Sequence, residues 1–354
     1  MDQREKAFGW AARDSSGLLS PFSFTLRANG EEDITLKVLY CGVCHTDLST
    51  IKNEWGNAQY PVVPGHEIIG VVTDIGLKVS NFKVGDIAGI GYIAFSCLSC
   101  ENCSSNFENY CPKLVPFFNG TLPDETTTYG GFSNKITINE HFSVKIPENL
   151  PLPAGTAPLL CGGITVYCAL KNYGLNRPGL HLGVVGLGGL GHLAVKFAKA
   201  LGMKVSVVSS GGKREEAMKI LGADSFLVRG NSEEIKAAQG TMDGIIDTVP
   251  EVHDIVPLIG LLKTHGKLLM VGSPDKPLEL PVYPLMSGGK SIGGSMIGGV
   301  KDMQEMLKFA AAHHITAEVE VVPMDYVNTA MERLEKGDVR YRFVIDVAET
   351  IEAE

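Results

Sequence analysis

Hydrophobic positions along the chain change their spacing near residue 180, and the two patterns predict different folds. Residues 34–40 alternate between apolar and polar positions as a half-buried strand does, and residues 68–75 form a second run rich in β-branched side chains. Gly85-Asp86 marks a turn after this run. The first third of the chain is therefore expected to be a compact β-rich domain.

From residue 180 onward, apolar strands alternate with segments that have the 3.6-residue period of a helix. This alternation is typical of parallel strands joined by crossover helices and predicts an α/β fold. The glycine-rich stretch 287–299 is expected to be a loop between domains or beside a ligand. The expected strands are residues 180–185, 204–208, 244–246 and 267–271, and the expected helices are 192–201, 215–221 and 302–312.

Composition and charge narrow the function classes. The 354 residues suggest about two domains, and the net charge of −9 argues against nucleic acid as a partner, because phosphate binding needs clustered Lys and Arg. The most apolar stretch, residues 151–170, contains three prolines and three glycines and is expected to be a loop and a core helix rather than a membrane span. The first residues are charged, so the cytosol is the expected compartment.

Gly186, Gly188 and Gly191 form a G-x-G-x-x-G motif. The motif alone is weak, but here it follows an expected strand, opens an expected helix and precedes another strand, which is the context of a dinucleotide site. The glycines would let the backbone approach a pyrophosphate at the helix N-terminus. A glycine-rich packing turn is the alternative. The residues between these glycines complete the predicted loop: Leu187, Gly189 and Leu190.

The end of the next expected strand lacks the acidic residue that holds the ribose of NAD. Ser209 and Ser210 stand there instead, followed by Lys213 and Arg214. Hydroxyls and cations suit a 2′-phosphate, because charge-assisted hydrogen bonds to phosphate are strong. This pattern favours NADP(H). The alternative is that the two cations only solvate the start of the next helix, where a basic side chain would be poorly placed.

Four cysteines lie close together in a segment with little hydrophobic periodicity: Cys97, Cys100, Cys103 and Cys111. Four thiolates at the spacing C-x2-C-x2-C-x7-C can close a tetrahedral shell around zinc, which describes a structural site. Disulfides are the first alternative and are disfavoured by the lack of a signal-like leader. An iron–sulfur site is the second, and the common bacterial run has a shorter last spacing.

A second set of possible metal ligands is dispersed along the chain. Cys44, His66 and Cys161 offer two thiolates and an imidazole, the number of protein ligands at a catalytic zinc with one open position. Asp47 is expected to orient His66, and Glu67 to tune the metal or enter its shell transiently. Each cysteine alone is more often a buried apolar residue. Their combination with Gly-His-Glu and a separate four-cysteine loop favours the metal interpretation.

With these motifs, nearly the whole chain resembles the zinc-dependent medium-chain alcohol dehydrogenases, and within them the plant cinnamyl alcohol dehydrogenase group. The similar segments are residues 41–47 (CGVCHTD), 52–56 (KNEWG), 63–67 (VPGHE), 158–161 (PLLC), 186–192 (GLGGLGH) and 338–346 (DVRYRFVID). The resemblance implies a GroES-like β-rich catalytic domain built from residues 1–160 and 299–354. It also implies a central Rossmann domain with a doubly wound parallel sheet at residues 161–298, a cleft between the two and a homodimer.

The resemblance further implies roles for single residues. Thr46 is expected near the nicotinamide ribose in a proton relay. Further cofactor contacts are expected from Thr165, Thr248, Gly272, Ser295, Met296 and Ile297.

Three positions depart from the pattern of the lignin-forming members. Ser49 stands where those enzymes usually have His, Pro116 where they have Trp, and Met296 where they have Phe. A reshaped pocket is therefore expected, and similar departures occur in plant enzymes that reduce iridoid aldehydes or the iminium groups of monoterpene indole alkaloids. The expected function is an NADPH-dependent zinc reductase of a bulky terpenoid or alkaloid substrate. The alternatives are a cinnamyl alcohol dehydrogenase or broad aldehyde reductase, and a cofactor-binding zinc scaffold without catalysis.

Overall fold

The computed structural model describes residues 5–151, 153–274 and 276–351. The chain forms two compact units. Unit 1 comprises Met1–Cys161 and Gly298–Glu354, and unit 2 comprises Gly162–Ile297. Both ends of the chain thus belong to one unit, and each junction lies one residue from the expected boundary.

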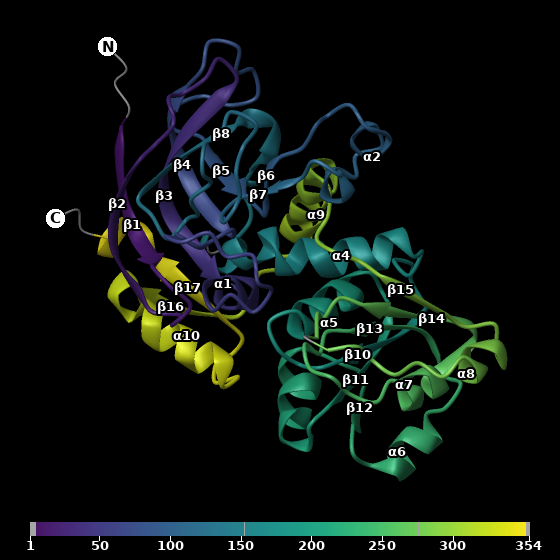
Figure 1. The fold of residues 1–354 in the computed structure, drawn as a ribbon. Helices are drawn as coiled ribbons and strands as arrows, with labels where there is room; N and C mark the ends of the chain where they lie inside the picture. The colour runs from purple at the N-terminus through teal and green to yellow at the C-terminus, as the bar shows by residue number, and fades with distance from the viewer. Residues whose placement is uncertain (1–4, 152, 275, 352–354) are drawn as a thin grey trace. The chain divides into compact units, whose positions relative to one another are not determined.

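Unit 1 is built on a seven-stranded sheet with the order β16-β17-β3-β4-β5-β9, in which β8 also pairs with β3 (Figure 1). Strand β17 near the C-terminus pairs antiparallel with β3, so that Val344 lies opposite Gly42. The sheet therefore contains strands from both the N-terminal and the C-terminal parts of the chain. Its strands are β3 (Asp33–Val43), β4 (Ile68–Ile75), β5 (Ile87–Ile90), β8 (Lys135–Asn139), β9 (Ser143–Lys145), β16 (Val319–Pro323) and β17 (Arg342–Asp346).

Two small hairpin-like sheets and short helices complete unit 1. The remaining strands are β1 (Lys6–Ala12) with β2 (Leu19–Thr25), and β6 (Ile93–Phe95) with β7 (Val115–Pro116). The α-helices are α1 (His45–Ile51), α2 (Glu101–Ser104), α3 (Pro153–Thr156), α9 (Val300–Ala312), α10 (Val327–Glu335) and α11 (Val347–Thr350). The 3-10 segments are η1 (Glu108–Tyr110), η2 (Glu140–Phe142), η3 (Ala157–Leu160) and η6 (Met324–Tyr326).

Unit 2 contains a six-stranded parallel sheet with the order β12-β11-β10-β13-β14-β15. Numbered from its first strand, this order is 3-2-1-4-5-6, the doubly wound arrangement that binds dinucleotides where the order reverses. Here the reversal lies between β10 and β13. The strands are β10 (His181–Val185), β11 (Lys204–Ser209), β12 (Ser225–Val228), β13 (Met242–Asp247), β14 (Leu262–Met270) and β15 (Ser291–Gly294).

Helices pack against this sheet and form an apolar core with it. Val185, Ile245 and Leu268 come from three neighbouring strands and pack in one buried cluster with the helix residue Leu258. The helical segments of unit 2 are α4 (Gly162–Asn172), α5 (Gly191–Ala200), α6 (Ser232–Ala237), α7 (Val256–Leu261), α8 (Tyr283–Met286), the 3-10 segment η4 (Gly211–Lys213) and the π-helical segment η5 (Glu216–Ile220).

Two expectations about local structure need correction. The glycine-rich stretch 287–299 is not wholly a loop, because residues 291–294 form β15 beside β14. Gly293 suits this strand for a packing reason: a Cβ there would lie 2.2 Å from the hydroxyl of Tyr173. The helix expected at residues 215–221 is a π-helical turn. The alternating αβ pattern that predicted the parallel sheet is confirmed.

No single helix in the described part of the chain is long and apolar enough to cross a membrane. A bent pair, Pro153–Leu160 followed by Gly162–Asn172, meets the length and composition criteria only when its two helices are taken together.

Candidate active site and metal centres

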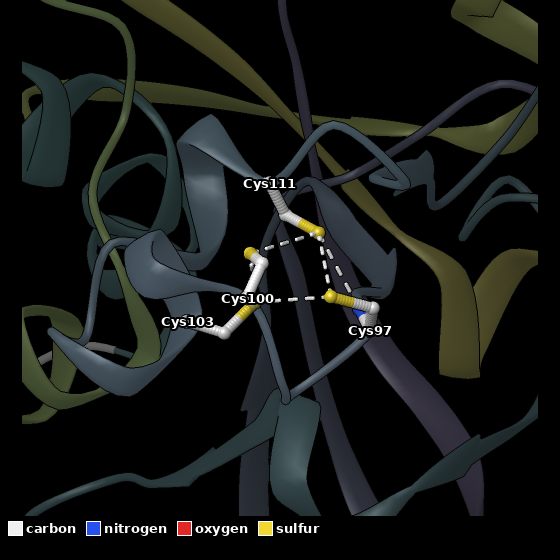
Figure 2. Close-up of side chains that lie close together, drawn as sticks. All are labelled: Cys97, Cys100, Cys103 and Cys111. Atoms are coloured by element: carbon white, nitrogen blue, oxygen red, sulfur yellow. Dashed lines mark hydrogen bonds between the residues drawn. The ribbon is translucent and has the colours of Figure 1, made fainter.

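The four cysteines of residues 97–111 converge in the structure, and their sulfur atoms point toward one another (Figure 2). Sγ of Cys97 lies 3.5 Å from Sγ of Cys111 and 4.0 Å from that of Cys103. Sγ of Cys100 lies 3.5 Å from that of Cys103 and 3.9 Å from that of Cys111. Tetrahedral zinc with bonds of about 2.3 Å requires sulfur atoms about 3.8 Å apart. The spacing of this cluster therefore fits a closed four-thiolate shell.

Polar groups around the cluster prepare the sulfur atoms for negative charge. The amide of Lys113 donates to Sγ of Cys111 over 3.3 Å, and the amide of Cys97 does so over 3.4 Å. A hydrogen bond from the backbone of Ser99 lowers the pKa of Cys97 to about 6, whereas burial raises the pKa of Cys103 to about 11. Only a cation among the sulfur atoms would hold all of them as thiolates.

The dispersed ligand set also converges. One ligand atom from each of Cys44, His66, Glu67 and Cys161 lies within 4.8 Å of the others. Cys44 is the N-cap of α1, the pair His66-Glu67 precedes β4, and Cys161 follows η3. All four residues belong to unit 1. The fold thus assembles, from three separate segments, the site that the sequence predicted.

Asp47 ties two of these segments together. Its Oδ2 accepts the backbone N–H of Cys44 over 2.8 Å, and its Oδ1 accepts the N–H of Gly65 over 3.0 Å. The same Oδ1 lies 3.0 Å from Nδ1 of His66. A carboxylate at Nδ1 holds the hydrogen there and leaves the lone pair of Nε2 available for a metal, as is usual for a metal-ligating histidine.

The unpartnered atoms of the site test whether a metal fits. Nε2 of His66 and Oε2 of Glu67 are buried and have no hydrogen-bond partner among the described residues. Leaving buried polar atoms unsatisfied costs about 1–3 kcal/mol each, so such atoms call for a ligand. Two thiols and an imidazole nitrogen around this point are soft and borderline donors that suit zinc. The residues present therefore fit the metal.

Glu67 is held by a partner that the sequence reasoning missed. Its Oε1 forms an ion pair of 2.5 Å with Arg342, and the two side chains are 0% and 5% exposed. Arg342 also donates to the carbonyl of Val43 over 3.0 Å. A Cβ at residue 42 would lie 2.0 Å from Oε2 of Glu67, which explains Gly42. The only signal in the sequence is a charged residue at the head of the apolar strand β17.

The ionisable groups of the site shift one another's pKa values. The adjacent thiol of Cys161 lowers the pKa of Cys44 well below its ordinary value, and the same contact raises that of Cys161. Burial raises the pKa of Glu67 to about 7 despite Arg342. Burial alone would lower the pKa of His66, but Asp47 and Cys44 outweigh it and raise that pKa.

Two aromatic rings enclose His66. Phe118 stacks on the imidazole with ring centroids 5.6 Å apart, and Tyr92 meets it edge-on at 5.5 Å. Sequence reasoning missed both, since aromatic residues in a β-rich segment are ordinary core residues. Of the three departures, Ser49 is buried in α1, Pro116 ends β7, and Met296 is half exposed. Thr46 is partly exposed on α1, three residues before Ser49.

The glycine motif of unit 2 forms the turn between β10 and α5, and its three glycines serve different purposes. Gly186 has a φ of +84°, which favours glycine. A Cβ at Gly191 would lie 2.1 Å from the carbonyl of Gly186, so the turn and the helix pack closely. A Cβ at Gly188 would meet no atom of the described residues within 4 Å. Open space beside Gly188 is what a pyrophosphate approaching the backbone requires, so the loop fits a dinucleotide.

The structure separates the roles of the two cations near β11. Nη2 of Arg214 donates to both carboxylate oxygens of Glu234, over 2.9 and 3.2 Å, and the guanidinium lies 5.1 Å over the ring of Phe226. Lys213 instead reaches the glycine turn, where Nζ donates to the carbonyl of Leu187 over 2.6 Å. Ser209 ends β11 and is buried, and Ser210 is exposed.

The other residues expected near the cofactor lie in unit 2, and all but Thr165 follow its strands. Thr248 follows β13 and donates to the carbonyl of Val185 over 2.8 Å. Gly272 follows β14, Thr165 is buried in α4, and residues 295–297 follow β15. The hydroxyl of Ser295 is buried and has no hydrogen-bond partner in the described part of the chain.

Comparisons with known proteins define the class of this chain. Residues 30–148 match the model of the alcohol dehydrogenase GroES-like domain, and residues 189–312 match the model of the zinc-binding dehydrogenases. Among curated relatives, the chain is 63% identical to a probable mannitol dehydrogenase of Mesembryanthemum crystallinum over 99% of this chain and 97% of the relative. It is 59% identical to a vomilenine reductase of Rauvolfia serpentina over 100% and 98%. It is 60% identical to an 8-hydroxygeraniol dehydrogenase of Catharanthus roseus over 98% and 97%.

Solved structures of dehydrogenases are also similar to this chain over nearly its whole length. A cinnamyl alcohol dehydrogenase of Sorghum bicolor matches with a TM-score of 0.96 and 59% identity, over 99% of this chain and 100% of that one. A CAD from Helicobacter pylori in complex with NADP(H) matches with a TM-score of 0.92 and 33% identity, over 99% and 100%. Fold and site thus define an oxidoreductase of the zinc-binding dehydrogenase class. Within that class, the chain belongs to the medium-chain alcohol dehydrogenases of the cinnamyl alcohol dehydrogenase group.

The arrangement can support hydride transfer. Zinc bound by Cys44, His66 and Cys161 would polarise a carbonyl oxygen or stabilise an alkoxide. Asp47 keeps the imidazole oriented, and Glu67 is held beside the ligands by Arg342. The aromatic rings of Tyr92 and Phe118 lie against His66, whose side chain is fully buried.

Proposed function

We propose that this protein is an NADPH-dependent, zinc-containing reductase that transfers hydride to the carbon of a C=O or C=N bond in a bulky terpenoid or monoterpene indole alkaloid. The observation that carries the proposal is the convergence of Cys44, His66 and Cys161, with the buried Nε2 of His66 unpartnered among the described residues, in a chain that also has a dinucleotide turn. The relatives named vomilenine reductase and 8-hydroxygeraniol dehydrogenase support the substrate class.

The proposal includes two zinc ions per chain, one in each cluster. Elemental analysis of the purified protein tests it directly, and two zincs with NADPH turnover are expected. One zinc and no turnover would favour the alternative of a cofactor-binding scaffold. The unpartnered atoms at His66 and Glu67 argue against that alternative, because a scaffold has no use for an open metal position.

For the cofactor, we propose that Lys213 rather than Arg214 binds the 2′-phosphate. Arg214 is already engaged by Glu234, whereas Lys213 lies against the glycine turn. Losing a charge-assisted bond costs about 1.5–3 kcal/mol, or roughly tenfold or more in affinity. Lys213→Ala should therefore reduce the preference for NADPH over NADH in kcat/KM about tenfold, and the matched control Arg214→Ala should reduce it much less. Equal kcat/KM for both cofactors in the unmutated enzyme would refute NADPH specificity.

The substrate is best identified by a turnover screen. NADPH would be combined with cinnamaldehydes, iridoid aldehydes and alkaloid iminium compounds, and the last two groups are expected to be preferred. A cinnamyl alcohol dehydrogenase or broad aldehyde reductase is the second candidate, favoured by the similarity to the Sorghum bicolor enzyme. Because the chain is similar to a probable mannitol dehydrogenase, the screen should also test oxidation of mannitol with NADP⁺.

Ser49 separates these candidates. It is buried in α1 and cannot act as a general base near neutral pH, as a histidine there would. Reduction of an iminium carbon by hydride leaves a neutral amine and needs no such proton transfer. We expect slow oxidation of cinnamyl alcohol and an improvement in Ser49→His. Fast oxidation that Ser49→His does not change would favour the ordinary dehydrogenase.

We further propose a homodimer formed through unit 2, in the cytosol. Among the described strands, β15 is the last of the sheet, and α8, which precedes it in the chain, carries exposed apolar side chains. Tyr283 is 76% exposed and Met286 is 72% exposed. An unpaired edge beside such a surface is suited to pairing with a second copy. Light scattering of the purified protein should give twice the chain mass, and Tyr283→Glu should lower it to one chain mass.

A further inference from the structure

We propose that Asp247 and His253 form a positioning pair that fixes the turn of Thr248 and Val249 inside the dinucleotide site and so sets the affinity for the nicotinamide cofactor. The inference rests on the proposed cofactor site at the glycine turn. It concerns two residues that act through this turn and do not themselves contact the cofactor.

The first observation is the set of bonds that Asp247 makes at the end of β13. The residue is fully buried. Its Oδ1 accepts the N–H of Val249 over 3.1 Å, and its Oδ2 lies 2.8 Å from Nε2 of His253. Its carbonyl accepts the N–H groups of Val271 and Gly272, both over 3.0 Å. Asp247 therefore forms hydrogen bonds both to the turn after β13 and to the start of the segment after β14.

The second observation is where this turn lies. A Cβ at Gly186 would lie 2.8 Å from Oγ1 of Thr248, and a Cβ at Gly272 would lie 2.2 Å from the carbonyl of Val249. The turn is thus packed between two glycine segments without room for a single methyl group. Because Val185 and Asp247 are register partners on β10 and β13, the turn also lies at the reversal of strand order, where such sheets bind ligands.

The third observation concerns His253. Its Nδ1 lies 2.8 Å from the carbonyl of Glu251, and a carbonyl can only accept. Nδ1 therefore carries a hydrogen, and the contact between Nε2 and Asp247 must share one further proton. The two side chains are 9% and 0% exposed. Breaking a buried pair of this kind leaves a polar group without a partner, and the turn that depends on Asp247 would relax.

A matched pair of substitutions tests this role. The amide nitrogen of Gln reaches about as far as Nε2 of His, so His253→Gln can still donate to Asp247, whereas the shorter His253→Asn cannot. The Kd for NADPH, measured by quenching of protein fluorescence, should rise about tenfold in His253→Asn and recover in His253→Gln. The change should fall on the KM for NADPH more than on kcat.

Two controls distinguish this role from general stability and from failure of the proposed site. His181 has bonds of 2.9 Å to the carbonyl of Thr241 and 2.7 Å to Ser206 at the opposite end of the same sheet. His181→Asn should lower Tm without changing the Kd for NADPH. Gly188→Val should abolish NADPH binding, because its side chain fills the space for the pyrophosphate.

The outcomes are distinct. An unchanged Kd in His253→Asn, with Gly188→Val defective, would overturn the positioning pair and leave the cofactor site intact. Normal NADPH binding by Gly188→Val would overturn the cofactor site and this inference with it. If His253→Asn is less stable, the rise in Tm at saturating NADPH provides a second measurement. A smaller rise than in the unmutated protein supports the inference, and an equal rise overturns it.

Discussion

The two cysteine-containing clusters of unit 1 differ in how they are built and in what they leave unfinished. The cluster of Cys97, Cys100, Cys103 and Cys111 comes from one segment of 15 residues, and each sulfur has sulfur neighbours near the spacing of a tetrahedron. The cluster of Cys44, His66 and Cys161 comes from three segments, and its buried Nε2 of His66 has no partner within the residues that the structure describes. A zinc ion with four protein ligands stabilises the local structure. A zinc ion with three protein ligands has an open position that can bind a substrate oxygen.

The largest effect is expected from breaking the closed shell. Cys100→Ser removes one of four ligands, and the binding of a structural zinc is part of the folding free energy of the segment that carries these ligands. The free energy of unfolding should fall by about 5 kcal/mol or more, with poor recovery of soluble protein. Denaturant unfolding and zinc content are the measurements. A variant of normal stability that keeps two zincs would show that this cluster is not a structural site.

The second effect should fall on activity and not on folding. Cys161→Ser removes a thiolate from the open site while the four-cysteine loop is untouched. The protein should fold, keep one zinc and bind NADPH, and kcat/KM for aldehyde reduction should fall roughly a hundredfold or more, since the Lewis acid supplies several kcal/mol. Full aldehyde reduction by this variant would contradict the role given to the zinc. Retained turnover of an iminium alone would indicate that an already electrophilic substrate needs less polarisation.

A third, smaller effect tests how the dispersed site is held. Asp47→Asn would place an amide where a carboxylate now accepts from Cys44, Gly65 and His66. Loss of such an outer partner typically costs 10- to 100-fold in metal affinity, estimated roughly from other metal sites. Competition with a chelator should release the zinc of the open site at lower chelator concentration. The four-cysteine zinc is the internal control, and its release should not change.

The smallest effect is a difference in acid sensitivity. The raised pKa of His66 means that its imidazole gains a proton, and loses its ligand lone pair, at a pH above the ordinary value of 6.5. Each site has one thiol of lowered pKa, Cys97 or Cys44, and one of raised pKa, Cys103 or Cys161. The imidazole of His66 is therefore the ligand that distinguishes the open site. As pH falls, the open site should therefore lose zinc first. Zinc release followed with a colorimetric chelator from pH 8 to 5 measures this order, and simultaneous release would remove the distinction between the two sites.

The sequence allowed prediction of most of the fold for a simple reason. Strands and helices of unit 2 have strong hydrophobic periods, so the parallel sheet follows from their alternation. The structure of residues 287–299 was harder to predict, because glycines normally indicate a loop. Here part of the segment forms a strand, because it pairs with a neighbouring strand and because Tyr173 leaves no room for a side chain. The glycine turn and the existence of α9 needed no tertiary information, because the local pattern changes at both, although α9 begins at Val300, two residues before the expected start.

The four-cysteine loop and the G-x-G-x-x-G turn were determined by the sequence itself, because their ligands and glycines are local and their spacing fixes the geometry. Only the tertiary structure decided the rest. It paired Arg342 with Glu67 across 275 positions, and it placed Tyr92 and Phe118 against His66. It also directed Arg214 to Glu234 and Lys213 to the glycine turn. These contacts depend on how distant strands are paired and how side chains fill the remaining space, which no local pattern encodes.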